Sequence, residues 1–246
     1  MLQKPVFIAV SELTLQAVLH LPDATLFPSP PVVIGSHGLL STKDSAKQLI
    51  LAEACTDFGV AYLRLDHRGC GESQGEFLTT TVGTRVEDLM AAAATLKEMG
   101  LSQNGRGLFG SSMGGATCLA GWEPLQGAGF PLKGMVSLAA PVTGEGITEA
   151  AIAAQDELHG VPLSFYRENM DFNLTKGLSA IHHILVVHGD ADEIVPVANA
   201  RLIMEKAKDP KELIINGGGD HRQSDPHHQA RFFQRAAQWF KEMFER

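Results

Sequence analysis

Apolar and polar residues alternate over residues 5–21, with an interruption at Ser11 and Glu12. A period of two is typical of strands with one exposed face, so we expect an N-terminal antiparallel hairpin. Apolar positions of its second half are Leu13, Leu15, Ala17 and Leu19. Later apolar runs are continuous, which predicts strands buried on both faces. These runs cover residues 32–34, 60–65, 107–109, 135–140, 184–187 and 213–215.

Segments with a helical period lie between these runs. Apolar residues recur at steps of four and three over residues 82–96, which predicts one face of a helix. In the last segment Asp225 is placed to cap a helix that has Pro226 at its first position. Strands that alternate with helices predict an α/β fold with a doubly wound, mostly parallel sheet. Ligands of such a sheet bind at the carboxyl ends of the strands. We therefore expect catalytic or binding residues in the loops that directly follow the strands.

The stretch of residues 143–180 is too long for a simple connection between two strands. Its pattern predicts a helix over residues 147–158 and a break over residues 160–162. An aromatic-containing piece follows, with Phe165, Tyr166, Met170 and Phe172. We interpret the stretch as a small cap inserted into a single domain of residues 1–246.

Composition and charge exclude several classes of protein. Of the 246 residues, 44% are hydrophobic and 20% charged, which excludes a disordered or collagen-like chain. The formal net charge of −8 makes nucleic acid an unfavourable partner. Three scattered cysteines (Cys55, Cys70, Cys118) are too few for a disulfide framework. No apolar run reaches the roughly 18 residues of a membrane span. We therefore predict a soluble, cytoplasmic protein.

The run Gly110-Ser111-Ser112-Met113-Gly114 lies between a predicted strand and the helical segment of residues 116–122. In this context G-x-S-x-G is a nucleophile elbow, whose glycines relieve crowding as the strand reverses into the helix. Ser112 is therefore the candidate nucleophile. We expect the side chain of Ser111, at the first x position, to point into the fold.

A serine hydroxyl needs a histidine to take its proton and a carboxylate to orient that histidine. Asp190 and Asp192 both follow the strand at residues 184–187, and either is a candidate for the acid. His221 follows the strand at residues 213–215, after a glycine run that gives the loop slack. Nucleophile, acid and base thus come in the order that α/β-hydrolases use.

The whole pattern resembles the α/β-hydrolase serine esterases, near the small-cap acyl esterase and monoacylglycerol lipase-like branch. The motifs that carry the resemblance are His37-Gly38-Leu39, the residues 66–73, the elbow, the stretch from His188 to Asp192, and Asp220-His221. It implies an α/β-hydrolase fold with Asp192 as the acid, because the family's acid stands three residues after the glycine of such a stretch. It also implies an oxyanion hole formed by the backbone N–H groups of Leu39 and Met113.

Other residues have competing interpretations. His37, Gly38, Phe165 and Tyr166 are candidate substrate contacts, although the two aromatic residues are equally well explained as packing. Five histidines are possible metal ligands, but no zinc-type motif joins them and we expect no metal or cofactor. They are His182, His183, His188, His227 and His228. Residues 143–180 have six acids and two bases, a net charge of −4 that weakly disfavours polyanionic substrates.

We therefore expect a serine hydrolase that cleaves carboxylic esters of small or medium acyl groups through an acyl-enzyme. Its activity should fall in acid as His221 becomes protonated. A thioesterase, a peptidase or a perhydrolase would use the same three residues. A receptor that keeps the fold and binds a small molecule without turnover is the alternative from another class.

Overall fold

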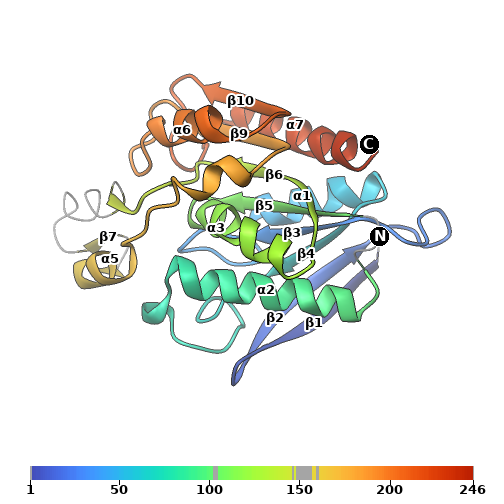
Figure 1. Ribbon diagram of the computed structural model, residues 1–246. Coiled ribbons are helices and arrows are strands. Elements are labelled where there is room, and N and C mark those ends of the chain that lie inside the picture. The colour runs from blue at the N-terminus through green and yellow to red at the C-terminus, as the bar shows by residue number, and fades with distance from the viewer. Residues whose placement is uncertain (1, 102–104, 146, 148–156, 159–160, 246) are drawn as a thin grey trace.

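A computed structural model describes residues 2–101, 105–145, 147, 157–158 and 161–245. Its main sheet has eight strands in the order β1-β2-β4-β3-β5-β6-β9-β10 (Figure 1). β1, β2 and β4 pair antiparallel, and all pairs from β4 to β10 are parallel. The predicted mostly parallel, doubly wound sheet with an N-terminal hairpin is confirmed.

The strands of this sheet are β1 (Leu2–Val10), β2 (Leu13–Leu21), β3 (Val32–Ser36), β4 (Ala61–Leu65), β5 (Arg106–Ser111), β6 (Leu132–Leu138), β9 (Ile184–Gly189) and β10 (Lys211–Asn216). A separate two-stranded sheet is formed by β7 (Glu157–Leu158) and β8 (Val161–Pro162). The helices are α1 (Ala46–Asp57), α2 (Val82–Glu98), α3 (Met113–Gly127), α5 (Leu163–Asn169), α6 (Ala198–Lys206) and α7 (Pro226–Phe244). Two 3₁₀ turns are η1 (Phe77–Thr79) and η2 (Gly177–Ala180).

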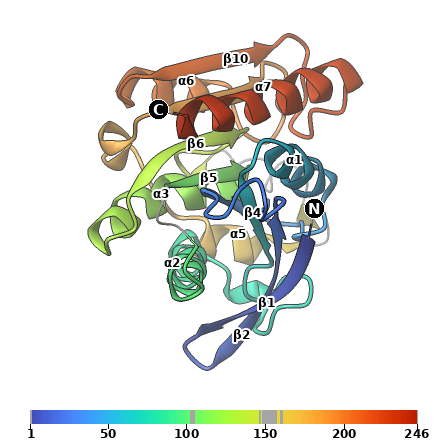
Figure 2. The same ribbon diagram turned by 90° about the vertical axis from the view of Figure 1, so that its right-hand side faces the viewer.

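Helices cover both faces of the sheet, as Figure 2 shows. Apolar side chains of α2, α3 and α6 pack on one face, and those of α1 and α7 pack on the other. The predicted start of α7 is confirmed, because the Asp225 carboxylate accepts the N–H of His227 at 2.7 Å. These layers leave the loops after β3, β5, β9 and β10 free to meet at one edge of the sheet.

Two expectations about single elements were wrong. β10 lies at the edge of the sheet and is only partly buried, so it is not covered on both faces. The expected helix over residues 147–158 does not reach its predicted end, because Glu157–Leu158 pairs as a strand with Val161–Pro162. Residues 148–156 of that helix, and Gly160 of the expected break, lie outside the described residues.

Cys55, Cys70 and Cys118 are buried free thiols. Within the described residues, no helix has the length and hydropathy needed to cross a membrane. The cytoplasmic location stays a prediction.

Candidate active site

Ser112 stands at the sharp turn that joins β5 to α3. Its backbone has φ 54° and ψ −123°, a left-handed conformation that costs energy for a residue with a side chain. A Cβ on Gly110 would collide with the carbonyl oxygen of Gly114, so the turn closes this tightly only with glycine at that position. The strained elbow predicted from G-x-S-x-G is thus present in the backbone.

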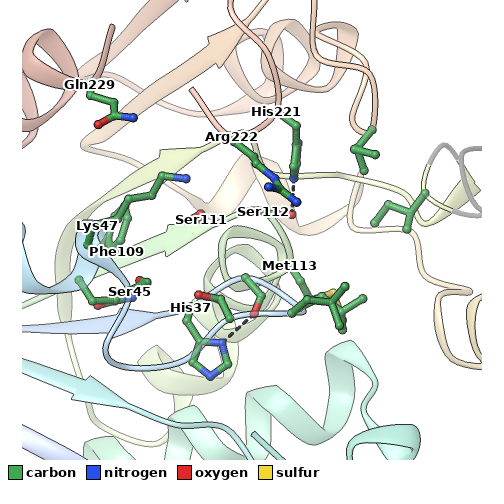
Figure 3. Close-up of a pocket in the computed structure, with 18 of the residues that line it drawn as sticks. His37, Ser45, Lys47, Phe109, Ser111, Ser112, Met113, His221, Arg222 and Gln229 are labelled. Atoms are coloured by element: carbon green, nitrogen blue, oxygen red, sulfur yellow. Dashed lines mark hydrogen bonds between the residues drawn. The ribbon is translucent and has the colours of Figure 1, made fainter. Parts of the chain in front are cut away.

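Three side chains from separate loops meet at this turn. His221 Nε2 lies 3.0 Å from Ser112 Oγ (Figure 3). His221 Nδ1 lies 2.9 and 3.0 Å from the two carboxylate oxygens of Asp192. The carboxylate can only accept, so Nδ1 carries the proton and Nε2 is free to accept from the serine hydroxyl. Ser111 is half-buried and lines the same pocket.

Asp192 is held ionised inside the protein. Burial alone would raise its pKa, but hydrogen bonds from His188, His221 and the Val195 N–H bring that pKa well below its usual value. The Val195 N–H donates to Asp192 Oδ1 at 2.7 Å, and His188 Nε2 lies 3.2 Å from Oδ2. Asp190 is exposed, and its carboxylate accepts the N–H of Gly218 at 2.6 Å instead. The structure therefore brings Asp192, and not Asp190, to His221.

The His37-Gly38-Leu39 loop lies against the elbow. A Cβ on Gly38 would be 3.7 Å from the Cβ of Ser112, which brings the backbone of this loop close to the nucleophile candidate. His37 Nδ1 donates to the Gly38 carbonyl at 2.7 Å, and His37 Nε2 accepts the N–H of His67 at 3.1 Å. Burial and the positive charge of Arg85 keep the pKa of His37 well below its usual value, so the ring is neutral.

Arg85 on α2 was not singled out from the sequence, yet it contacts this loop. Its guanidinium is fully buried and donates to the His37 carbonyl. Burial lowers the pKa of Arg85 to about 10, which leaves the group charged at neutral pH. The available signal was a pair of charged residues, Arg85 and Asp88, among the apolar positions of this helix, because a buried charge must find a partner inside the fold.

A cavity of about 630 Å³ opens beside Ser112. His37, Gly38, Leu39 and Met113 line it, so the expected oxyanion loop and the residue after the nucleophile both face the same space. Of the expected cap contacts, Tyr166 lines the cavity. Phe165 is not among the described residues that do, because its ring stacks on Phe77 with centroids 5.2 Å apart.

Two positively charged side chains also line the cavity and were missed from the sequence. Lys47 belongs to the first turn of α1, and Arg222 follows His221 directly. Their positions in the sequence could have indicated that they lie near the site, because both follow parallel strands, one at a helix start and one in a loop.

Three of the five histidines proposed as possible metal ligands have other side-chain contacts. His182 and His183 pack edge-on against Trp122 and Trp239, and His188 donates to the Val195 carbonyl at 2.8 Å. Over the described ranges of the chain, no group of three histidine, cysteine or acidic side chains is placed to hold a metal ion.

The sheet order and the strand-turn-helix site define the α/β-hydrolase fold, as the motifs predicted. The chain belongs to the prolyl oligopeptidase family, whose model matches residues 47–246.

The chain is also similar to a thioesterase in sequence and to two esterases in fold. The mouse palmitoyl-protein thioesterase ABHD10, a mitochondrial protein, is 25% identical over 227 residues, which cover 79% of this chain and 70% of the mouse protein. Est1E from Butyrivibrio proteoclasticus, solved with ferulic acid bound, superposes with a TM-score of 0.80 at 21% identity, over 98% of this chain and 100% of Est1E. An esterase from Pyrococcus furiosus gives a TM-score of 0.78 at 19% identity, over 98% and 91% of the two chains.

Proposed function

We propose that the protein is a serine hydrolase that cleaves carboxylic esters of small or medium acyl groups through a covalent acyl-enzyme. The observation that carries the proposal is the position of the His221 ring between Ser112 Oγ, at 3.0 Å, and the Asp192 carboxylate, at 2.9 Å. This is the contact order that nucleophilic catalysis by serine requires.

In the proposed reaction His221 Nε2 accepts the proton of Ser112 while Oγ attacks the ester carbonyl. The resulting imidazolium then gives that proton to the leaving alcohol, and an acyl-serine remains. Water then attacks the acyl-serine carbonyl as His221 takes one of its protons. His221 returns that proton to Ser112 Oγ as the acyl–oxygen bond breaks and the carboxylic acid leaves. Asp192 stays ionised and holds the ring in the tautomer that both half-reactions need.

The proposed oxyanion hole consists of the backbone N–H groups of Leu39 and Met113. Met113 is the first residue of α3, where the helix dipole favours negative charge. Each such donor is worth about 10²- to 10³-fold in rate. The proposal is supported by the loop at Gly38, which lies beside Ser112, and by the cavity that both donors line.

Hydrolysis of a short p-nitrophenyl ester tests this assignment. Ser112→Ala should lower kcat by about 10⁴-fold or more, as loss of a triad member does. Ser111→Ala is the matched control from the same turn and should retain turnover. Loss of activity in Ser111→Ala with activity kept in Ser112→Ala would assign the nucleophile to Ser111. Absence of turnover in the unaltered protein would favour a binding protein.

A thioesterase is the second candidate, because ABHD10 carries that activity in its name. The same serine, histidine and oxyanion donors would serve either substrate. Esters and thioesters with the same acyl group, compared by kcat/KM, decide between the two. A higher value for the ester supports the proposal, and a higher value for the thioester replaces it.

A further inference from the structure

The charged side chains that line the cavity have one sign. Among the described residues that line it, the formally charged ones are Lys47 and Arg222, and no carboxylate joins them. This differs from the segment over residues 143–180, where the sequence has an excess of acids. Of the acids of that segment which the structure describes, none lines the cavity.

Lys47 extends from α1 into the cavity, and Figure 3 shows its amino group directed towards the side on which Ser111 and Ser112 lie. The side chain is half-buried, and no ion pair or hydrogen bond to a described residue holds its ammonium group. Burial lowers the pKa of Lys47; Asp220 acts in the opposite direction, and Arg222 lowers it further. A half-buried ammonium that no described carboxylate holds by a hydrogen bond is available to pair with a carboxylate of a ligand in the cavity.

Arg222 comes from the loop that carries His221, across the cavity from α1 (Figure 3). Its side chain is exposed, so it stands at the rim, whereas Lys47 lies deeper. Both side chains line the same cavity, and the charge of Arg222 contributes to the lowered pKa of Lys47. Both cationic side chains thus stand on the wall of the cavity beside Ser112, in a protein with a net charge of −8.

We propose that the substrate is an ester that carries a carboxylate near its scissile carbonyl, and that Lys47 and Arg222 bind this carboxylate. The inference rests on the proposed ester hydrolysis and adds the substrate class. One ammonium and one guanidinium suit a single carboxylate, to which arginine can donate two parallel hydrogen bonds. A polyphosphate has more negative charge than two cations neutralise, and the acidic surface of the protein would repel it.

The test compares pairs of esters that differ in one terminal group. For the acyl side the pair is the mono-p-nitrophenyl ester of adipic acid and p-nitrophenyl hexanoate. For the alcohol side the pair is 4-acetoxybenzoate and 4-methylphenyl acetate. The readout is the ratio of kcat/KM between the charged and the neutral ester of each pair, measured for the unaltered protein and for Lys47→Met.

In one of the two pairs this ratio should fall by about 10- to 100-fold in Lys47→Met, the range expected for a hydrogen bond to a charged group. Lys47→Arg keeps the charge and should keep most of the preference. Arg222→Met should lower the ratio less, because its side chain is exposed. Lys4→Met, an exposed lysine on β1 at the far edge of the sheet, is the control and should change neither ratio.

Failure of the inference and failure of the proposed function are distinguishable. If the neutral esters are hydrolysed but Lys47→Met leaves both ratios unchanged, the inference is overturned and the esterase function stands. If the unaltered protein hydrolyses no ester of either pair, the proposed function is overturned and the substrate class with it.

Discussion

Asp190 and Asp192, two residues apart after β9, have different hydrogen-bond partners. The Asp192 carboxylate is fully buried against His221 and His188, whereas Asp190 is exposed and accepts from the backbone of the next loop. Two carboxylates of the same chemical type, two residues apart on one loop, thus lie in different surroundings: one is buried at the site and the other is exposed to solvent. From the residues alone both were candidates, and the resemblance to esterases was needed to choose Asp192.

Asp192→Asn should lower kcat by about 10⁴-fold, because the amide cannot hold His221 in the tautomer that accepts from Ser112. Steady-state hydrolysis of a p-nitrophenyl ester measures this change. Asp190→Asn is the matched control and should stay near the unaltered rate. Equal losses in the two variants would argue that the loop, and not the Asp192 carboxylate, is what matters.

The positions of Ser112 and His221 could be predicted because each follows a strand at the edge where ligands bind. Whether Phe165, Lys47 and Arg222 line the cavity could not be predicted from the sequence. Phe165 and Tyr166 are neighbours of similar chemistry, and only the packing of α5 on Phe77 decides which one faces the cavity. Lys47 and Arg222 lie far apart in sequence, so their shared cavity is a product of the fold.

At the scale of elements, the turn from β5 to α3 is packed against the loop after β3. A Cβ on Gly114 would meet the carbonyl oxygens of Ser36 and His37, which are backbone atoms that cannot move independently. The second glycine of G-x-S-x-G therefore has a packing role between two loops, as well as a conformational one.

Gly114→Ala should destabilise the protein by about 1–3 kcal/mol through overpacking. The Tm should fall by roughly 3–10 °C. Gly127→Ala, at the other end of the same helix, is the control: a Cβ there meets nothing within 4 Å. It should be neutral or stabilising by up to about 1 kcal/mol, as alanine is the better helix former. A similar Tm for the two variants would contradict the packing role of Gly114.

α2 reaches the site through Arg85, which donates to the carbonyl of His37. Arg85→Met keeps the apolar stem and removes this donor, so the oxyanion loop should lose its fixed position. We expect kcat to fall roughly 10- to 100-fold, less than for loss of an oxyanion donor itself. KM should change little, because the effect is on the transition state. A rise in KM with kcat unchanged would show that Arg85 acts on substrate binding instead.

The cap is where element prediction failed. The apolar spacing of residues 147–158 suits a helix, but Glu157 and Leu158 pair with Val161 and Pro162 in a two-stranded sheet. Such a short hairpin has too few residues to impose a period of two on the sequence. The long helices, in contrast, were predictable: α2 and α7 repeat their apolar faces over several turns and have Thr81 and Asp225 as side-chain caps.

At the scale of the whole molecule, stability should depend on pH through three buried histidines. Burial and Arg64 lower the pKa of His20 to about 4, and burial keeps those of His37 and His67 well below the usual value. All three regain an ordinary pKa of about 6.5 on unfolding. Between pH 6.5 and 4 the unfolded chain binds more protons, so the free energy of unfolding falls as pH falls.

Urea unfolding at pH 7, 6 and 5 measures this dependence. Each neutral buried histidine contributes a slope of up to about 1.4 kcal/mol per pH unit. His20→Gln keeps an acceptor for the Arg64 Nε donor, which lies 2.7 Å from His20 Nε2, and should reduce the slope by one histidine. A free energy of unfolding that does not change from pH 7 to pH 5 would contradict the burial of neutral rings.

The antiparallel or parallel type of most strands follows from their hydrophobic patterns. The alternation over residues 5–21 marks the hairpin, and the continuous runs mark the parallel strands that helices cover on both faces. The exception is β10, whose run of apolar residues resembles a central strand although it stands at an edge. Whether a strand lies at the edge of the sheet depends on the strand order, and a run of three apolar residues does not indicate that order.

The most direct test of the central claim is peptide mapping by mass spectrometry after reaction with a fluorophosphonate. The account predicts one phosphonate adduct per chain, on Ser112, with labelling that slows sharply in Asp192→Asn. An adduct on Ser111, or no adduct in a protein that still hydrolyses esters, would contradict it.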